Sequence, residues 1–273
     1  MYQILLLGEK GLLGKVIKQT LIKNNFNFLI VNVSKKDNIK SKQELYKLFN
    51  NYTDRKNPIL IINCITALNP NNISDNYVNE KLPNDLLSYS LNRASFLIHF
   101  STTNVLIKKL NDKYTIQKEM SENLIFKNIN NNFLIMRLPL LLPLDSFEIG
   151  KIPRQFKILK NFINFPGFSF IPPSRNLYRP IDAQIIADKV IFYLRNKKEL
   201  KKSNLINFHG ANSMNLKEIS KLLLSKNLKR KNNSMIEIPF PWKILDRLFI
   251  LYPNLQLIFQ KNVFLQQFLC INR

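Results

Sequence analysis

The stretch LLLGEKGLLGKVIKQTL, residues 5–21, decides the fold of this chain. An apolar run stops at Gly8, two further glycines follow at three-residue steps as Gly11 and Gly14, and a helical pattern takes over. Glycine allows a tight turn and lets a ligand approach the backbone, and the unpaired N–H groups of a helix N-terminus attract phosphate. Because the glycines lie between a predicted strand and a predicted helix, the sequence favours a dinucleotide-binding loop over a plain turn. Leu12 and Leu13 lie inside this loop and are predicted to contact the cofactor with it.

The first 140 residues alternate between predicted strands and helices. Short apolar runs without alternating polarity, typical of strands buried on both faces, occupy residues 2–7, 28–33, 59–64, 96–101 and 133–138. Helical patterns occupy residues 12–24, 41–51, 76–92 and 113–127. This order predicts an α/β fold, a doubly wound parallel sheet with right-handed crossovers.

The sequence changes character after Pro139, where proline and aromatic residues become frequent. Further elements are predicted as a helix at residues 183–194, a strand at 204–208 and a helix at 216–226. We expect a nucleotide-binding domain at residues 1–140, to which residues 181–210 return, and a smaller substrate-binding region at residues 141–273. The apolar tail at residues 239–268 is interpreted as core helices, with a partner-binding helix pair and a lipid-touching surface as alternatives.

The composition restricts the classes of function. The formal charge of +23 comes from 41 basic and 18 acidic residues. Because basic residues are spread along the chain without interleaved aromatics, a solvated lysine-rich surface is favoured over a specific nucleic-acid binder. Two cysteines, no N-terminal signal pattern and no run of 18 apolar residues predict a cytoplasmic protein without a membrane span. The oligomeric state is left open, with a homodimer among the alternatives.

The residues after the second predicted strand bear on the choice of dinucleotide. An acidic residue about 20 positions after the glycine loop would bind both ribose hydroxyls of NAD. Asn32 stands near that place instead, and Ser34 and Lys35 follow it. These residues favour NADP over NAD, because a lysine can pair with a 2′-phosphate.

A candidate reactive pair lies in YTIQKEMSE, residues 114–122. Tyr114 and Lys118 are four residues apart and therefore share one helix face. A free tyrosine has a pKa of about 10, and a nearby ammonium is expected to lower that pKa by stabilising the phenolate. Such a tyrosine can exchange a proton with a substrate oxygen near neutral pH. Thr102, at the carboxyl end of a predicted strand where open α/β sheets bind ligands, is expected to hydrogen-bond the same oxygen.

With these motifs in this order, the sequence resembles the extended short-chain dehydrogenases/reductases, the branch that holds nucleotide-sugar epimerases and dTDP-4-dehydrorhamnose reductase. Besides the glycine loop, the matching stretches are INCITA (62–67), YVNEKLPNDLL (77–87), STTNV (101–105), YTIQKEMSE (114–122), MRLPLLLP (136–143) and FHGANSMNLKEIS (208–220). In INCITA, Cys64 and Ile65 lie where the family's strand meets the cofactor.

The resemblance implies a Rossmann-type fold and an NAD(P)-dependent reductase or epimerase that acts on a nucleotide-linked sugar. It implies that Tyr114 is the acid/base, that Lys118 holds the ribose and lowers the tyrosine pKa, and that Thr102 orients the substrate oxygen. Asn79 stands where the family keeps an active-site asparagine, and Glu122 completes the Tyr-x-x-x-Lys-x-x-x-Glu helix.

Departures from the family leave a second class of function open. Only 12 positions separate Thr102 from Tyr114, fewer than is usual in the family, and Gln184 stands near a common aspartate position. Thr103 and Asn104 replace the Asp-Glu pair of sugar dehydratases, so dehydration is disfavoured. The alternative is a divergent cofactor-binding protein without catalysis, such as a redox sensor or a scaffold.

Other polar residues receive structural interpretations. His99 and Arg137 lie in predicted buried strands and are expected to be structural, and His209 is expected to stand beside a strand end. Arg175 and Arg179 lie in the proline-rich region, where a forked guanidinium suits a diphosphate and a plain surface role is the alternative. The two histidines are far apart in the sequence, and so are the two cysteines, so no zinc site is predicted.

Overall fold

The computed structural model of the chain describes residues 3–31, 41–53, 57–67, 73–91, 96–107, 112–127, 132–142, 169–171, 177–202, 204–215, 217–219, 221–222 and 235–237. The predicted cofactor residues Asn32, Ser34 and Lys35 lie outside these ranges, as do Arg175 and the apolar tail. The chain divides into two units, one formed by Met1–Leu141 with Ile181–His209 and the other by Leu142–Pro180 with Gly210–Arg273.

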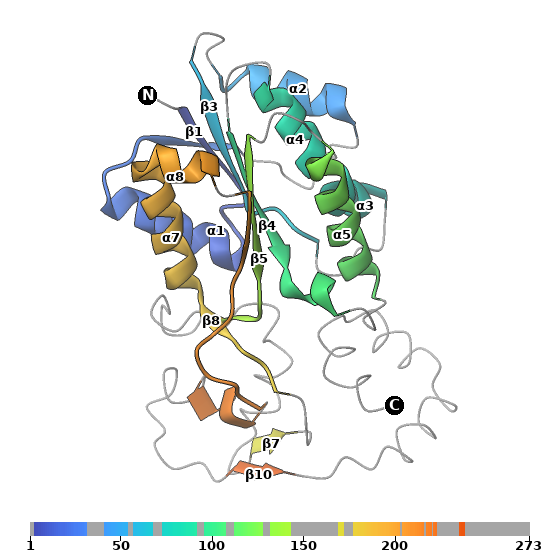
Figure 1. Cartoon of the computed structure of the whole chain (residues 1–273), viewed down its shortest axis with the longest axis vertical. Coiled ribbons are helices and arrows are strands. Elements are labelled where there is room, and N and C mark those ends of the chain that lie inside the picture. The colour runs from blue at the N-terminus through green and yellow to red at the C-terminus, as the bar shows by residue number, and fades with distance from the viewer. Residues whose placement is uncertain are drawn as a thin grey trace. The chain divides into compact units, whose positions relative to one another are not determined.

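A six-stranded parallel sheet forms the centre of the first unit (Figure 1). Its strands are, in spatial order, β2 (Phe28–Val31), β1 (Gln3–Leu7), β3 (Ile59–Asn63), β4 (Phe96–Thr102), β5 (Phe133–Leu138) and β9 (Leu205–Asn207). β2 and β3 flank β1, with Leu6 opposite Ile30 on one side and Ile62 on the other. The strand order therefore reverses between β1 and β3, where sheets of this kind bind ligands. The predicted doubly wound parallel sheet is confirmed.

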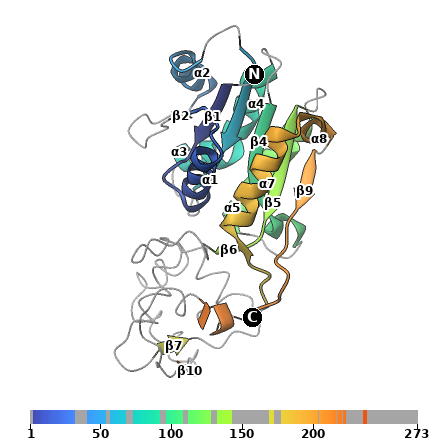
Figure 2. The ribbon, with the colours of Figure 1, turned by 90° about the vertical axis from the view of Figure 1, so that its left-hand side faces the viewer.

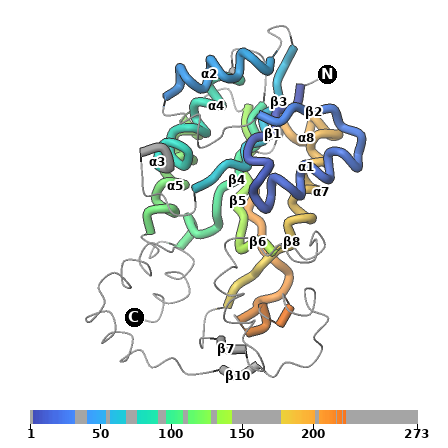
Figure 3. Tube along the Cα trace, turned by 180° about the vertical axis from the view of Figure 1, so that it is seen from behind, coloured from blue at the N-terminus to red at the C-terminus, as the bar shows by residue number. Residues whose placement is uncertain are grey.

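Helices cover both faces of this sheet. α1 (Leu12–Lys23) and α7 (Ala183–Arg195) lie side by side on one face, and α8 (Lys197–Lys202) follows α7 (Figure 2). The opposite face carries α2 (Lys42–Asn50), α3 (Ile73–Glu80), α4 (Leu82–Leu91) and α5 (Lys113–Phe126), which gather together when the trace is seen from behind (Figure 3).

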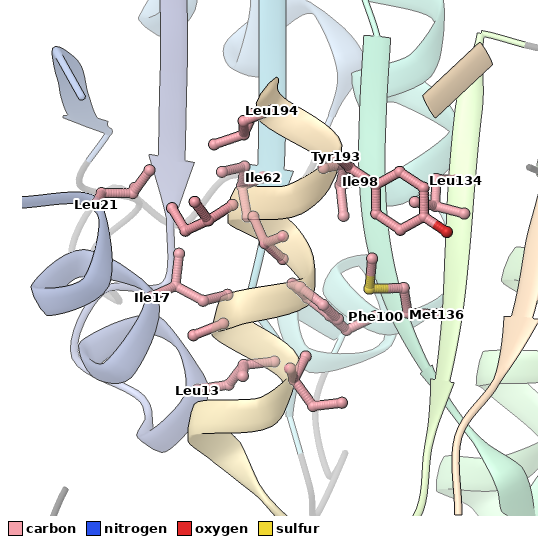
Figure 4. Close-up of a cluster of buried hydrophobic side chains, with 14 of the residues drawn as sticks. Leu13, Ile17, Leu21, Ile62, Ile98, Phe100, Leu134, Met136, Tyr193 and Leu194 are labelled. Carbon is pink, nitrogen blue, oxygen red and sulfur yellow. The ribbon is translucent and has the colours of Figure 1, made fainter. Parts of the chain in front are cut away.

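The core between α1, α7 and the sheet explains why α1 forms where it does. Leu13, Ile17 and Leu21 recur four residues apart and make one apolar stripe that faces α7 and the strands (Figure 4). Ile62 and Ile98 meet this stripe from β3 and β4. Burial of each such side chain contributes about 1.5–3 kcal/mol, so this layer fixes the helix that follows the glycine turn.

A second apolar layer lies on the opposite face of the same strands. Leu5, Leu7 and Ile61 point into it and pack with Phe49 of α2 and Leu86 of α4. Since neighbouring residues of one strand are buried on opposite faces, the strands show no alternation of apolar and polar residues.

The prediction of one continuous helix over residues 76–92 is wrong, because α3 ends at Glu80 and α4 begins at Leu82. Pro83 explains the break. It has no N–H to donate to the carbonyl oxygen of Asn79, and its ring would clash with that carbonyl in a continuous helix. In the first turn of α4 the same proline removes no hydrogen bond, because the first N–H groups of a helix have no acceptor within that helix.

Several short elements were not predicted. They are η1 (Thr103–Leu106), β6 (Leu141–Leu142), β7 (Ser169–Ile171), β8 (Ile181–Asp182), β10 (Met235–Glu237) and α8. β7 pairs in parallel with β10, and β6 pairs with β8. Of the helix predicted at 216–226, residues 217–219 and 221–222 are helical and the others lie outside the description. None of the helices in the described ranges is long and apolar enough to cross a membrane.

Candidate active site

The glycine turn after β1 is built by close backbone contacts. Gly8 has a φ of +78°, and a Cβ added there would lie 2.7 Å from the carbonyl carbon of Cys64. A Cβ at Gly14 would lie 2.1 Å from the carbonyl oxygen of Gly8. A Cβ at Gly11, by contrast, would meet only the carbonyl oxygen of Gly8, at 3.4 Å. The fold therefore requires glycine at positions 8 and 14, whereas position 11 has room for a side chain or for a ligand.

The start of α1 leaves backbone donors without a side-chain cap. Gly11 is the N-cap, its own N–H donates to Gly8 at 3.0 Å, and the first turn holds no acidic residue. The side chains of Leu12 and Leu13 pack against the core, so a ligand at this turn would meet the backbone of these residues. Uncapped N–H groups next to an open glycine position fit the pyrophosphate of a dinucleotide.

The end of β3 lies directly beside the glycine turn. The N–H of Cys64 donates to the carbonyl oxygen of Leu7 at 3.0 Å, which brings the two strand ends together at the point of order reversal. The N–H of Ile65 donates to the side chain of Asn63 at 3.1 Å. Burial raises the pKa of the Cys64 thiol well above its usual range, although the nearby Lys118 ammonium acts in the opposite direction. The thiol is therefore neutral near pH 7.

The face of α5 that turns toward the sheet is polar. The N-cap Asp112 accepts the N–H of Thr115 at 2.9 Å and its hydroxyl at 2.6 Å, which fixes the start of the helix. Lys118 is buried and donates from Nζ to the carbonyl oxygen of Phe100 on β4 at 3.0 Å. The same Nζ lies 6.0 Å from the centre of the Tyr114 ring. The structure thus confirms that Tyr114 and Lys118 share one face of one helix.

The protonation of this pair differs from the sequence prediction. Burial raises the pKa of Tyr114 to about 12, while a hydrogen bond with Thr66 acts to lower it and the Asp112 carboxylate acts to raise it. Burial also lowers the pKa of Lys118 to about 8, against the effect of the Glu122 carboxylate. The expectation that the pKa of Tyr114 is lowered is wrong for this state of the protein, because burial is the largest effect on that pKa and raises it.

Thr102 is the last residue of β4 and caps η1. Its hydroxyl accepts the N–H of Asn104 at 3.2 Å, and its side chain is largely buried. It follows Phe100, the partner of Lys118, by two residues, and α5 packs against both β4 and η1. Thr102 therefore stands at the carboxyl edge of the sheet on the strand that holds Lys118.

Asn79 is fully buried and its amide is used within the protein. Its Oδ1 accepts the N–H of Ala67 at 2.9 Å and the hydroxyl of Thr66 at 3.2 Å. Its Nδ2 donates to the carbonyl oxygen of Ala67 at 2.7 Å and to Gln117 at 3.0 Å. Asn79 thus holds the loop after β3 against α5, and it stabilises the site rather than presenting a free group.

Two further polar clusters support the same helix. His99 is buried between Asn63, at 3.2 Å from Nδ1, and Ser121, at 3.5 Å from Nε2. Arg137 on β5 donates from Nε to both carboxylate oxygens of Glu122, at 3.0 and 3.1 Å. The structural interpretations of His99 and Arg137 are confirmed.

Sequence reasoning missed Thr66, Gln117 and Ser121. Gln117 and Ser121 lie on the face of α5 that carries Tyr114 and Lys118, so their helical spacing was a signal that could have found them. His209 is exposed at the end of the segment after β9. The described part of the chain contains no group of three His, Cys, Asp or Glu side chains that could hold a metal ion.

Comparison with known proteins finds similarity in structure but not in sequence. No protein-family model matches the chain, and no curated protein matches its sequence. Solved structures do match. The dTDP-4-dehydrorhamnose reductase from Yersinia enterocolitica superposes with a TM-score of 0.68 at 15% identity, over 88% of this chain and 86% of that chain.

The predicted resemblance is confirmed in the fold. The dTDP-4-dehydrorhamnose reductase from Bacillus anthracis, solved in complex with NADP, has a TM-score of 0.64 at 13% identity, over 88% of this chain and 85% of that chain. The UDP-glucose 4-epimerase from Thermotoga maritima, solved with UDP-glucose, has a TM-score of 0.62 at 11% identity, over 87% and 85%. The chain is similar to these enzymes in its Rossmann-type α/β fold.

Proposed function

We propose that the chain is an NAD(P)-dependent oxidoreductase or epimerase that acts on a nucleotide-linked sugar. One observation supports this most strongly: Cys64 lies between the glycine turn and the reactive helix. Its carbonyl group lies against Gly8, and its side chain is close enough to Lys118 for each to affect the pKa of the other. A phosphate-binding turn and a tyrosine–lysine pair are therefore neighbours at the point where the strand order reverses.

The cofactor in this proposal is NADP or NAD, held by the residues of the turn. The backbone of Gly11, Leu12 and Leu13 would bind the pyrophosphate, and Cys64 and Ile65 would line the far side. Asn32, Ser34 and Lys35 would select NADP through its 2′-phosphate. Lys118 would hold the nicotinamide ribose. The match to a solved reductase in complex with NADP agrees with this assignment.

Tyr114 carries the proton chemistry in this proposal. Reduced NADP supplies a hydride when bound, and Tyr114 supplies the proton, so that a substrate carbonyl becomes an alcohol. A tyrosine whose pKa is about 12 is protonated at neutral pH and is therefore ready to act as the acid. Thr102 would accept or donate a hydrogen bond at the same substrate oxygen.

Turnover of Tyr114→Phe decides between an enzyme and a cofactor-binding protein without catalysis. NADPH oxidation is followed with a panel of nucleotide-linked keto sugars, and NADPH affinity is measured in parallel by its fluorescence. We expect unchanged affinity and a loss of at least about 100-fold in turnover, as is usual when a general acid is removed. Equal turnover in Tyr114→Phe and wild type would contradict the proposal. Saturable binding without any turnover in wild type would favour the non-catalytic alternative.

A further inference from the structure

The side chain of Asn63 ties the end of β3 to the segment that follows it. Asn63 is buried, and its Oδ1 accepts the N–H of Ile65 at 3.1 Å. The N–H of Cys64, which lies between them in the sequence, still donates to the carbonyl oxygen of Leu7 at 3.0 Å. The chain therefore leaves the sheet at Ile65, and the turn is shaped by the hydrogen bond that asparagine side chains make two residues onward.

The peptide group that Asn63 holds is also the one that lies on the glycine turn. A Cβ added to Gly8 would lie 2.7 Å from the carbonyl carbon of Cys64, 2.8 Å from its oxygen and 2.8 Å from the nitrogen of Ile65. All three atoms belong to the peptide group that joins Cys64 to Ile65. This group thus packs on Gly8, while its N–H is held by Asn63. The two contacts together fix the plane of the peptide group.

A buried histidine determines which end of the Asn63 amide faces Ile65. Asn63 and His99 are register partners on the parallel strands β3 and β4, and Asn63 Nδ2 lies 3.2 Å from His99 Nδ1. The backbone N–H of Ile65 can only donate, so the amide atom that receives it is Oδ1 and Nδ2 is left for the histidine. His99 must therefore accept at Nδ1. A flipped amide would point its own N–H groups at the N–H of Ile65.

The same histidine connects this contact to the reactive helix. Its Nε2 lies 3.5 Å from the hydroxyl of Ser121, which is buried on α5 three residues after Lys118. Because Nδ1 of His99 accepts, the ring proton lies on Nε2 and points at Ser121. Buried side chains thus lead from α5 through β4 to the peptide group that lies on the glycine turn.

We propose that Asn63 is a positioning residue of the dinucleotide site, because its side chain holds the Cys64–Ile65 peptide group against Gly8. His99 keeps the Asn63 amide in the orientation that this requires. The inference deepens the proposed function and rests on it, since Cys64 and Ile65 are the residues proposed to line the cofactor. In this role Asn63 acts through the N–H of Ile65 rather than by touching the cofactor.

Amide hydrogen exchange, measured by NMR in the cofactor-free protein, tests the contact residue by residue. We expect Asn63→Leu to speed exchange at Ile65 about three- to tenfold, because its N–H loses its acceptor. Exchange at Cys64 should change little, since the carbonyl oxygen of Leu7 still accepts that N–H, whereas general damage would speed exchange at both residues. Asn63→Asp retains an acceptor and should keep exchange at Ile65 slow. Asn63→Ala replaces Asn63→Leu if the leucine variant does not fold, with the same expectation.

The aspartate variant also gives a spectroscopic signature. An ionised carboxylate accepts but cannot donate, so the His99 ring should carry a proton on Nδ1 in Asn63→Asp. The ring of wild type should carry its proton on Nε2 alone. Long-range ¹H–¹⁵N NMR distinguishes the two forms. Loss of buried volume or of stability would not move this proton, so a ring that stays protonated on Nε2 alone in Asn63→Asp would overturn the inference.

NADPH affinity, measured by nucleotide fluorescence, connects the contact to the proposed site. Asn63→Leu should weaken NADPH binding about tenfold, because the peptide group that lines the cofactor is no longer fixed. Thr53→Val removes a buried hydroxyl that bonds Phe49 and Tyr89 between α2 and α4, and should lower stability without lowering affinity.

Two results would overturn the inference. One is wild-type exchange at Ile65 in a folded Asn63→Leu or Asn63→Ala variant, and the other is wild-type NADPH affinity in a variant whose exchange at Ile65 is fast. Because exchange and the histidine signature are measured without cofactor, failure of wild type to bind NADPH would count against the proposed function alone.

Discussion

The Nζ of Lys118 donates a hydrogen bond to the carbonyl oxygen of Phe100 at 3.0 Å, and this contact anchors α5 to β4 inside the first unit. Lys118 is almost completely buried, and its pKa is lowered to about 8 chiefly by that burial. An unfolded lysine ionises at about 10.4. Between about pH 8 and 10.4, Lys118 therefore carries a proton in the unfolded chain but not in the folded chain.

The stability of wild type relative to Lys118→Met should therefore rise with pH. A lowered lysine pKa means that charging Lys118 costs the folded state free energy, and this cost disappears as pH increases through the range from 8 to 10.4. We expect a relative gain of about 3 kcal/mol across that range, measured by urea denaturation. Lys113→Met, at an exposed position of the same helix, should show no such trend. A flat difference for Lys118→Met would contradict the burial argument.

The glycine turn allows a matched pair of substitutions. In Gly14→Ala the new Cβ would lie 2.1 Å from the carbonyl oxygen of Gly8, so we expect a large loss of stability or failure to fold. In Gly11→Ala the nearest atom is 3.4 Å away, which is ordinary contact, so thermal unfolding should shift little. NADPH affinity should nevertheless fall about tenfold or more in Gly11→Ala, because the methyl group occupies the space proposed for the pyrophosphate. Wild-type affinity in this folded variant would argue against the assigned loop.

The Glu122–Arg137 pair should behave as a buried ion pair. Glu122→Gln leaves the Arg137 guanidinium without its charge partner, and we expect a loss of about 3–5 kcal/mol in the free energy of unfolding. The double variant Glu122→Leu with Arg137→Met removes both charges and should recover most of that loss. Urea denaturation of the single and double variants measures the coupling. Additive losses would show that the two side chains do not depend on each other.

His99 should remain neutral through the physiological range. Burial lowers its pKa well below 6.5, and the Lys118 ammonium acts in the same direction. The Asn63 oxygen is taken by the N–H of Ile65, so the Asn63 amide nitrogen donates to Nδ1 of His99, which leaves the ring proton on Nε2. Long-range ¹H–¹⁵N NMR should show this tautomer without titration between about pH 5.5 and 8.

Acid should destabilise the protein through the same histidine. Below pH 6.5 the unfolded chain protonates His99 while the folded chain does not, so the free energy of unfolding falls as pH falls. His99→Asn retains an acceptor for Asn63 and cannot take up the proton, so its loss of stability between about pH 6.5 and 5 should be smaller than that of wild type. An equal loss in both proteins would show that His99 does not stay neutral.

Local patterns predicted most of the first unit. The apolar runs of β1, β3 and β4 and the glycine turn before α1 depend on residues close in sequence, so they could be read directly. Pro83 separates α3 from α4, because in a continuous helix its ring would clash with the carbonyl group four residues earlier. This signal is local, but the helical pattern of residues 76–92 concealed it. The pairing of Tyr114 with Lys118 followed from helical spacing alone.

The environment of that pair could not be predicted from spacing. The pKa of Tyr114 depends on burial and on Thr66, which lies 48 positions earlier in the chain, and only the folded arrangement brings them together. The inner face of α5 is polar, so it gives no apolar stripe, and its partners Asn79 and His99 come from two other elements. Contacts of this kind are set by the tertiary structure.

A crystal structure of the protein with NADP would show whether the dinucleotide joins the glycine turn to Tyr114. We expect the pyrophosphate to lie against the backbone of Gly11, Leu12 and Leu13, and the nicotinamide ring to lie beside the hydroxyl of Tyr114 with its ribose on Lys118. A dinucleotide bound elsewhere, or one whose nicotinamide lies away from Tyr114, would contradict the proposed function.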